Sequence, residues 1–187
     1  MRLFAALIPP DPVLAELMDT VHAVDPSMRE LDATPVDRLR IPVTGFGNVA
    51  QGDAETLLTA LRRSASEWTR PELRFAGSAA LEFPGDISVW ARVDGDVDGL
   101  LTVGRGVPPA VQRIGFFVDR RQFRPWLAVG DINDDTSAPY LEKLVGALDD
   151  FKGQPWTLEH LTILRRVPTD GSGGVDEVVH EEIPLGE

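Results

Sequence analysis

Hydrophobic residues recur at helical spacing in three segments of this chain. The first segment begins near Asp11, the second covers residues 52–68 with Asp53 as its expected N-cap, and the third covers residues 138–151. Their apolar positions are Val13, Leu14, Leu17, Met18 and Val21, then Leu57, Leu58, Leu61, Ala65 and Trp68, and last Leu141, Leu144, Val145, Leu148 and Phe151. We therefore predict three amphipathic helices, each with one face in the core.

Shorter apolar or alternating runs predict strands between these helices. The expected strands cover residues 2–8, 39–49, 72–77, 79–83, 87–93, 124–133, 156–167 and 176–185. The last two are joined by the turn-rich stretch "PTDGSGG", which predicts a closing hairpin. Between residues 96 and 113, several glycines and two adjacent prolines predict a shortened or broken helix.

The order of these elements indicates an α+β fold with an internal duplication. A strand–helix–strand–helix rhythm occurs twice, and the hairpins between call for antiparallel or mixed sheets. The sequence contains no linker or low-complexity tract, so we expect residues 1–187 to form one domain of two intertwined lobes.

Composition narrows the classes of function. The net charge of −12 disfavours tight, non-specific binding to a nucleic-acid backbone, although it leaves room for a local basic groove. The one basic concentration comprises Arg113, Arg120, Arg121 and Arg124, and it is either such a groove or a solvated surface loop. The chain has no cysteine and no apolar run long enough for a membrane span, so we expect a cytoplasmic protein.

Several stretches together resemble the 2H phosphoesterases, and within them the RNA 2′,3′-cyclic phosphodiesterase branch known as the 2′-5′ RNA ligase family. "DRLRIPVTGFGNV" resembles the family's first motif segment, Asn-Leu-His-x-Thr-Leu, and "FRPWLAVGDIN" its second, Phe-x-Pro-His-x-Thr-Leu. "MRLFAALIPP" is similar to the opening strand, and the last two strands to the final hairpin. Framework positions Leu39, Gly47, Phe123 and Pro125 also fit. The resemblance implies two pseudo-symmetric lobes with antiparallel or mixed sheets around a central cleft.

The catalytic positions of both motif segments differ from the family pattern. Family catalysis uses two histidines as general base and acid, and each threonine helps to hold the phosphate. Here Arg40 and Pro42 stand at the first His and Thr positions, and Trp126 and Ala128 at the second. Arginine stays protonated at neutral pH and indole is only a donor, so neither can cycle a proton. The loss of each acid or base typically costs a factor of about 10² to 10⁴ in rate, so we expect the 2H reaction to be absent.

One His-x-Thr triplet lies elsewhere, at His160, Leu161 and Thr162. We expect Leu161 and Ile163 to face inward, which directs His160 and Thr162 to the other side of the strand. The triplet is then either a half-exposed strand histidine or part of a relocated phosphodiesterase site with His180 on the partner strand. Two histidines without a third ligand make a weak metal site, so we predict none.

Alternating residues of the two motif strands are expected to face the cleft. Arg40 can bind a phosphate and Trp126 can stack a base, with Thr44 and Arg124 as further ligand-binding candidates. In the alternative interpretation Trp126 fills the cleft as a hydrophobic plug and Arg40 pairs with a carboxylate. Asp131, where the family commonly carries a basic residue, disfavours phosphate binding.

Three functions remain open. The leading hypothesis is a protein that has lost both catalytic histidines and binds a nucleotide or RNA end, or serves as an interaction module. The others are a phosphodiesterase that uses His160 and His180, and a structural protein-binding module with an occluded cleft. The sequence has no P-loop, dinucleotide-binding glycine pattern or HExxH helix, so neither a metal nor an organic cofactor is implied, and no protein partner is indicated.

Overall fold

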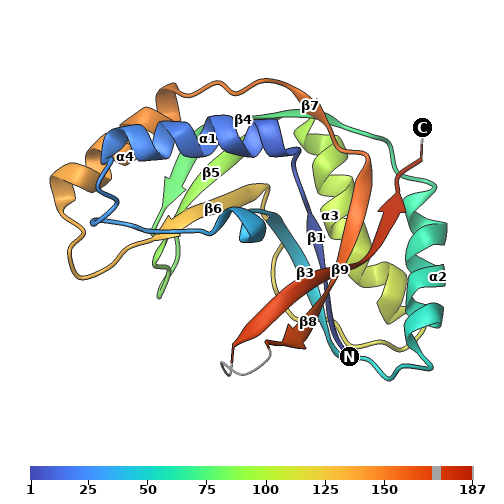
Figure 1. The fold of residues 1–187 in the computed structure, drawn as a ribbon. Helices are drawn as coiled ribbons and strands as arrows, with labels where there is room; N and C mark the ends of the chain where they lie inside the picture. Colours follow the sequence, from blue (N-terminus) through green and yellow to red (C-terminus); the bar gives the residue numbers. More distant parts are fainter. Residues whose placement is uncertain (170–173, 187) are drawn as a thin grey trace.

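Two antiparallel sheets form the framework of the protein, which a computed structural model describes for residues 1–169 and 174–186 (Figure 1). The first sheet has the strand order β3-β1-β8-β9 and the second the order β2-β6-β5-β4-β7. The first contains β1 (Arg2–Leu7), β3 (Ile41–Asn48), β8 (His160–Pro168) and β9 (Val175–Pro184). The second contains β2 (Asp32–Ala33), β4 (Glu72–Ala80), β5 (Ser88–Gly95), β6 (Trp126–Asp131) and β7 (Trp156–Thr157).

Two helices accompany each sheet. They are α1 (Asp11–Val24), α2 (Ala54–Ala65), α3 (Val97–Gln112) and α4 (Ala138–Asp150), with a short 3₁₀ turn η1 at Val36–Arg38. Figure 1 shows α1 beside α4 at one end of the molecule and α2 beside α3 at the other. The three predicted helices are confirmed, and the buried residues of α1 and α2 match the predicted faces. In α4 only Leu144 and Leu148 of the predicted face are fully buried, together with Tyr140, which was not predicted. Asp53 precedes α2, but its side chain makes no capping hydrogen bond.

The expectation of a broken helix between residues 96 and 113 is wrong, because α3 runs without interruption through both prolines. Asp96 caps the helix by accepting a hydrogen bond from Gly99 N at 3.0 Å. Its glycines are packing positions: a Cβ on Gly104 would lie 2.4 Å from the ring of Phe123, and one on Gly106 would lie 2.7 Å from Trp68. Buried contacts on this face offset the weak helix propensity.

Two strand boundaries also differ from the prediction. The strands predicted for residues 72–77 and 79–83 form one strand, β4, which ends at Ala80. Gly77, at φ +88°, lies in a bulge of this strand where a turn was expected. Residues 156–167 divide into two strands, since the chain leaves the second sheet after Thr157 and enters the first at His160. The predicted closing hairpin is confirmed in β8 and β9, although part of its loop, residues 170–173, lies outside the described residues.

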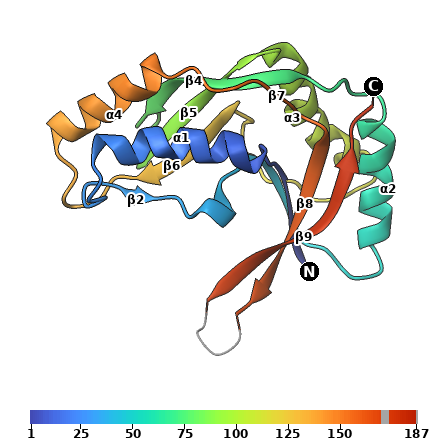
Figure 2. The ribbon, with the colours of Figure 1, turned by 45° about the horizontal axis from the view of Figure 1, so that its top comes forward.

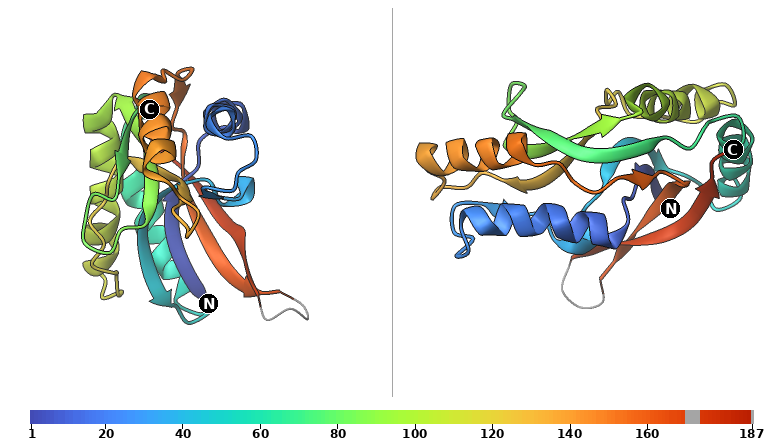
Figure 3. Two further views of the ribbon diagram at one scale, coloured as in Figure 1. Left: turned by 90° about the vertical axis from the view of Figure 1, so that its left-hand side faces the viewer. Right: turned by 90° about the horizontal axis from the view of Figure 1, so that it is seen from above.

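The first sheet is assembled from both ends of the chain. Strand β1 pairs with β3 on one side and with β8 on the other, and β9 forms the outer edge. Figures 2 and 3 show the β8–β9 hairpin reaching beyond the body of the molecule. The buried residues of both sheets join one hydrophobic core. Within the described ranges, no helix has the length and apolar character needed to cross a membrane.

Candidate functional site

Two adjoining cavities lie where the motif strands β3 and β6 approach each other. The arginine cavity, of about 300 Å³, lies over β1, β3 and β8. The aromatic cavity, of about 430 Å³, lies beside β5 and β6. Pro42 and Arg121 line both, so the two cavities form one continuous cleft between the sheets.

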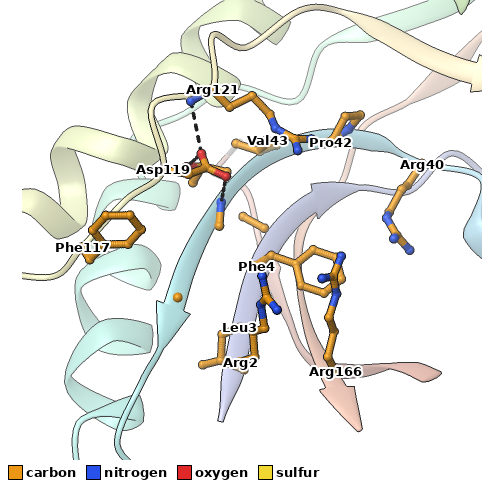
Figure 4. Close-up of a pocket in the computed structure, with 14 residues that line it drawn as sticks. Arg2, Leu3, Phe4, Arg40, Pro42, Val43, Phe117, Asp119, Arg121 and Arg166 are labelled. Atoms are coloured by element: carbon orange, nitrogen blue, oxygen red, sulfur yellow. Dashed lines mark hydrogen bonds between the residues drawn. The ribbon is translucent and has the colours of Figure 1, made fainter. Parts of the chain in front are cut away.

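Four arginines from four different segments line the arginine cavity (Figure 4). Arg2 comes from β1, Arg40 directly precedes β3, Arg166 comes from β8, and Arg121 comes from the loop between α3 and β6. Asp119 is the one acidic side chain among the lining residues. A protein with a net charge of −12 therefore concentrates positive charge at this position.

Glu177 of β9 neutralises part of the charge of two of these arginines, Arg40 and Arg166. Its carboxylate forms an ion pair with the Nη2 of Arg40 and accepts a hydrogen bond from the Nε of Arg166 at 3.1 Å. Both guanidinium groups also stack on the ring of Phe4, at 5.0 and 5.4 Å from its centroid. The Glu177 side chain is only 10% exposed, so the cluster is partly desolvated.

Arg2 and Arg121 remain free of any partner among the described residues. Neither guanidinium makes an ion pair or hydrogen bond, and both side chains are exposed. Arg2 also lies directly opposite Arg166 in the β1–β8 register. Like charges placed opposite each other on antiparallel strands repel, so an anion bound between them would be stabilised.

Asp119 fixes the loop that carries Arg121 to strand β3. Its carboxylate accepts hydrogen bonds from the Thr44 hydroxyl at 2.8 Å, Gly45 N at 3.0 Å and Arg121 N at 3.3 Å. Its own backbone N–H donates to Gly45 O at 2.9 Å. Both oxygens of this carboxylate are therefore engaged with a donor, and its role is to position the loop.

Three aromatic rings line the aromatic cavity. Trp126 and Trp90 are neighbours, with ring centroids 6.3 Å apart at 51°, and the third ring, Phe83, is 38% exposed. Arg124 stacks between Phe83 and Trp126 at 4.5 and 5.0 Å, and Arg92 contacts Trp126 at 5.3 Å. Trp90 Nε1 donates to Asp86 at 3.1 Å. These contacts orient the rings around an open space.

The structure brings the predicted ligand-binding residues to this cleft in two groups. Arg40 and Thr44 line the arginine cavity, whereas Arg124 and Trp126 line the aromatic cavity. Trp126 forms a wall of its cavity and does not fill it, so the plug interpretation does not describe this geometry. The same interpretation also expected Arg40 to pair with a carboxylate, and Arg40 does pair with Glu177.

The remaining motif positions contribute little to the cleft. Ala128 lines neither cavity, and its carbonyl accepts a hydrogen bond from the Thr34 hydroxyl at 2.8 Å. Asp131, expected to oppose phosphate, lines neither cavity and instead accepts a hydrogen bond from Ser88 at 2.6 Å. Asp131 therefore adds no negative charge to the lining of the cleft.

His160 and His180 are not brought together. His160 pairs with Pro184 at one end of β8, while His180 lies at a bulge between Val179 and Glu181, further along β9. His160 and Thr162 line a separate cavity with Asp11, Glu159 and Glu182. Across the described part of the chain, no three His, Asp or Glu side chains are arranged to hold a metal ion.

Several residues of the cleft and its margin carry no signal in the sequence. Arg121 belonged to the recognised basic segment, but Arg2, Arg166 and Glu177 gave no local signal because they meet only through strand pairing. Phe4 lies two residues after Arg2 on β1, so the two side chains share one face of the strand. This spacing is the one pattern that could have indicated a face of arginine and aromatic side chains.

The two antiparallel sheets around this cleft define the fold of the 2H phosphoesterases. TT0787 of Thermus thermophilus is 19% identical with a TM-score of 0.65, and both chains are covered completely. E. coli LigT complexed with 3′-AMP is 15% identical with a TM-score of 0.73, over 100% of this chain and 98% of LigT. LigT complexed with ATP is 13% identical with a TM-score of 0.70 over the same shares. No protein-family model matches the sequence, and no curated protein matches it.

Proposed function

We propose that this protein binds the phosphate-bearing end of a nucleotide or RNA in its cleft and does not hydrolyse it. The observation that carries the proposal is the pair of adjoining cavities, one lined by four arginines and the other by three aromatic rings. A nucleotide carries a matching pair of groups, an anionic phosphate and a flat aromatic base, which its sugar joins. Arg121, which lines both cavities, stands where the two parts of the ligand would be joined.

Free positive charge supports phosphate binding. Arg2 and Arg121 have no partner in the described part of the chain, and each can donate charge-assisted hydrogen bonds to a phosphate. An anion beside Arg2 would also relieve its repulsion with Arg166. Arg40 and Arg166 add to the local potential, although Glu177 neutralises part of their charge.

The aromatic cavity supports binding of a base. Base–aromatic stacking is worth about 1–3 kcal/mol per base and requires an accessible ring face. Trp126 and Trp90 are half-buried and Phe83 is 38% exposed, so these rings border open space. Arginines at 4.5–5.3 Å from the Phe83 and Trp126 rings hold them in position.

The proposed lack of hydrolysis follows from the side chains that line the cleft. Of the described lining residues, Asp119 is the only one with a carboxyl or imidazole group that could exchange a proton, and its oxygens are occupied by Thr44, Gly45 and Arg121. Hydrolysis of a cyclic phosphate needs one group to accept a proton and another to donate one. Arginine and tryptophan can do neither at neutral pH.

The structural neighbours support the same class of ligand. LigT has been crystallised with 3′-AMP, with ATP and with NADP⁺, three phosphate-bearing adenine nucleotides. The sequence identities are low, so this likeness is a guide to the first ligands to test.

Calorimetric titration with adenosine 3′-phosphate at low salt tests the proposal. We expect saturable binding that Arg121→Ala weakens by about 10- to 100-fold, equivalent to one charge-assisted hydrogen bond. Trp126→Ala is expected to weaken it by about 5- to 100-fold through lost stacking. Arg113→Ala is the matched control, because Arg113 is an exposed arginine that lines a groove beside α2 and α3 and neither cavity of the cleft.

A hydrolysis assay with adenosine 2′,3′-cyclic phosphate completes the test. We expect the cyclic nucleotide to remain intact, and product formation that Arg40→Ala or Trp126→Ala abolishes would refute a non-catalytic role. Absence of binding by cyclic and linear nucleotides at millimolar concentration would instead favour a protein-interaction module with a closed cleft.

A further inference from the structure

Phe117 is an exposed aromatic ring at the rim of the arginine cavity. It lies in the loop between α3 and β6, and 66% of its surface is accessible, compared with 38% for Phe83. It lines the arginine cavity, yet it takes no part in the aromatic cavity around Trp126. Single exposed apolar residues are common on protein surfaces, so exposure alone assigns no role to Phe117.

Strand β3 and the hydrogen bonds of Asp119 hold the Phe117 ring in position. A Cβ on Gly47 would lie 3.3 Å from Phe117 Cδ1, so the ring packs directly on the backbone of β3. The loop is held two residues later by Asp119, whose N–H donates to Gly45 O at 2.9 Å and whose carboxylate binds Thr44 and Gly45. Figure 4 shows Phe117 and Asp119 beside the same strand. The ring therefore contacts β3 through Cδ1 and Cε1, while most of its surface is accessible.

Strand β3 sets the order of the groups along the cleft. Pro42 lies where the arginine cavity meets the aromatic cavity, and Gly47, five residues further along, lies beneath Phe117. At about 3.3 Å per residue, these positions are roughly 16 Å apart. The arginine cavity thus adjoins the aromatic cavity, which Trp126 lines, near Pro42 at one end of this stretch, and Phe117 lines the arginine cavity at the other end.

We infer that Phe117 is a second stacking platform, which makes the cleft select ligands with two aromatic ring systems joined through phosphate over mononucleotides. This inference rests on the proposed function, because it assigns one base to the aromatic cavity and the phosphate to the arginines. The second ring system then stacks on the accessible surface of Phe117. A short single-stranded oligonucleotide and a dinucleoside pyrophosphate share this chemistry.

Calorimetric titration at one salt concentration with three ligands tests the inference. The ligands are adenosine 3′-phosphate, a 3′-phosphorylated triadenylate and NADP⁺. We expect at least one of the two longer ligands to bind about tenfold or more tightly than the mononucleotide. The tighter of the two shows whether the cleft prefers an oligonucleotide or a dinucleoside pyrophosphate. Phe117→Ala is expected to weaken that ligand by about 5- to 100-fold, the usual effect of losing one stacked base, and to change mononucleotide binding by less than about twofold.

Two further variants separate stacking from a structural effect. Phe117→Tyr keeps the aromatic face and is expected to retain the tight binding. Ile114→Ala removes another exposed apolar side chain that lies near Phe117 but lines neither cavity of the cleft, and it is expected to leave all three affinities unchanged. Thermal melting of each variant checks that the loop has not unfolded.

The outcomes distinguish this inference from the proposed function. If the mononucleotide binds in an Arg121- and Trp126-dependent manner but the longer ligands gain nothing, the inference fails and the proposed function stands. Equal weakening of all ligands by Phe117→Ala also overturns it, because the ring would then only support the loop. If none of the ligands binds, both the inference and the proposed function fail.

Discussion

Glu177 forms an ion pair with Arg40 although the two residues are 137 positions apart in the sequence. The pair joins the segment before β3 to the edge strand β9 across β1 and β8. A carboxylate thus already occupies an anion-binding position at the margin of the arginine cavity, where the phosphate of a ligand would compete with it.

Removing this internal carboxylate is expected to strengthen ligand binding. In Glu177→Gln, Arg40 and Arg166 lose their counter-charge, and we expect adenosine 3′-phosphate to bind about fivefold more tightly, equivalent to about 1 kcal/mol. The same change should lower the free energy of unfolding by about 1 kcal/mol, mainly because the largely buried Arg40 loses its charged partner, while the exposed Arg166 is screened by solvent. Titration and chemical denaturation measure the two effects.

Glu181→Gln is the matched control for that experiment. Glu181 lies on the same strand and pairs with Arg62 of α2 at 2.6 Å, outside the cleft. Its substitution should affect stability alone. Weaker nucleotide binding in Glu177→Gln would show that Glu177 positions the arginines and does not compete with the ligand.

Thr44→Val tests whether Asp119 positions the loop. The substitution keeps the shape of the side chain and removes the 2.8 Å hydrogen bond to the Asp119 carboxylate. We expect the free energy of unfolding to fall by about 1 kcal/mol. Binding of adenosine 3′-phosphate should weaken because Arg121, whose N–H donates to Asp119, loses part of its support. Unchanged affinity in a destabilised protein would show that the loop is held without this bond.

Two glycine-to-alanine substitutions in helices are expected to have opposite effects. Gly104→Ala places a methyl group 2.4 Å from the Phe123 ring, and such overpacking should cost about 1–3 kcal/mol of stability. Gly146→Ala, in α4, meets no atom within 4 Å and should stabilise the protein by about 0.5–1 kcal/mol through improved helix propensity. Thermal or chemical denaturation distinguishes the two. Equal effects would contradict the packing of Gly104 against Phe123.

Tyr140 is expected to make stability fall at alkaline pH. Burial, together with the negative charges of Asp25 and Glu30, raises the pKa of Tyr140 from 10.0 to about 12. The folded state therefore keeps the phenol proton at pH values where the unfolded state loses it, so this contribution is full below pH 10 and lost as pH rises towards 12.

Tyr140→Phe measures this effect directly. The Tyr140 hydroxyl is buried and has no hydrogen-bond partner among the described residues, so its removal should leave stability at pH 7 unchanged or slightly higher. Between pH 10 and 12 the variant should lose less stability than the parent protein. Parallel loss in both proteins would mean that other groups control alkaline unfolding.

The sequence was sufficient to predict much of the fold because apolar periodicity reports which faces are buried. It predicted a shortened or broken helix where α3 is continuous, because glycine and proline have low helix propensity. In the structure, Gly104 and Gly106 make room for Phe123 and Trp68 from distant segments. The sequence also did not predict that residues 156–167 divide into β7 and β8, because β-propensity does not indicate which sheet a strand joins.

The candidate site was predictable only where it follows from one strand. Alternation along the motif strands placed Arg40, Thr44 and Trp126 at the cleft, and they line its cavities. The partners of these residues depend on strand order and register. Arg166 and Glu177 reach Arg40 through pairings that span most of the chain, so no local pattern could indicate them.

The central position of β1 has a consequence for biosynthesis. Its two neighbours are β3, which ends at Asn48, and β8, which begins at His160. At about 5–20 residues per second, a ribosome needs on the order of ten seconds to make the chain between them. During that interval one edge of β1 has no native partner, and unpaired edges of this kind favour association with other chains. We expect the nascent protein to depend on chaperones until its last hairpin has emerged.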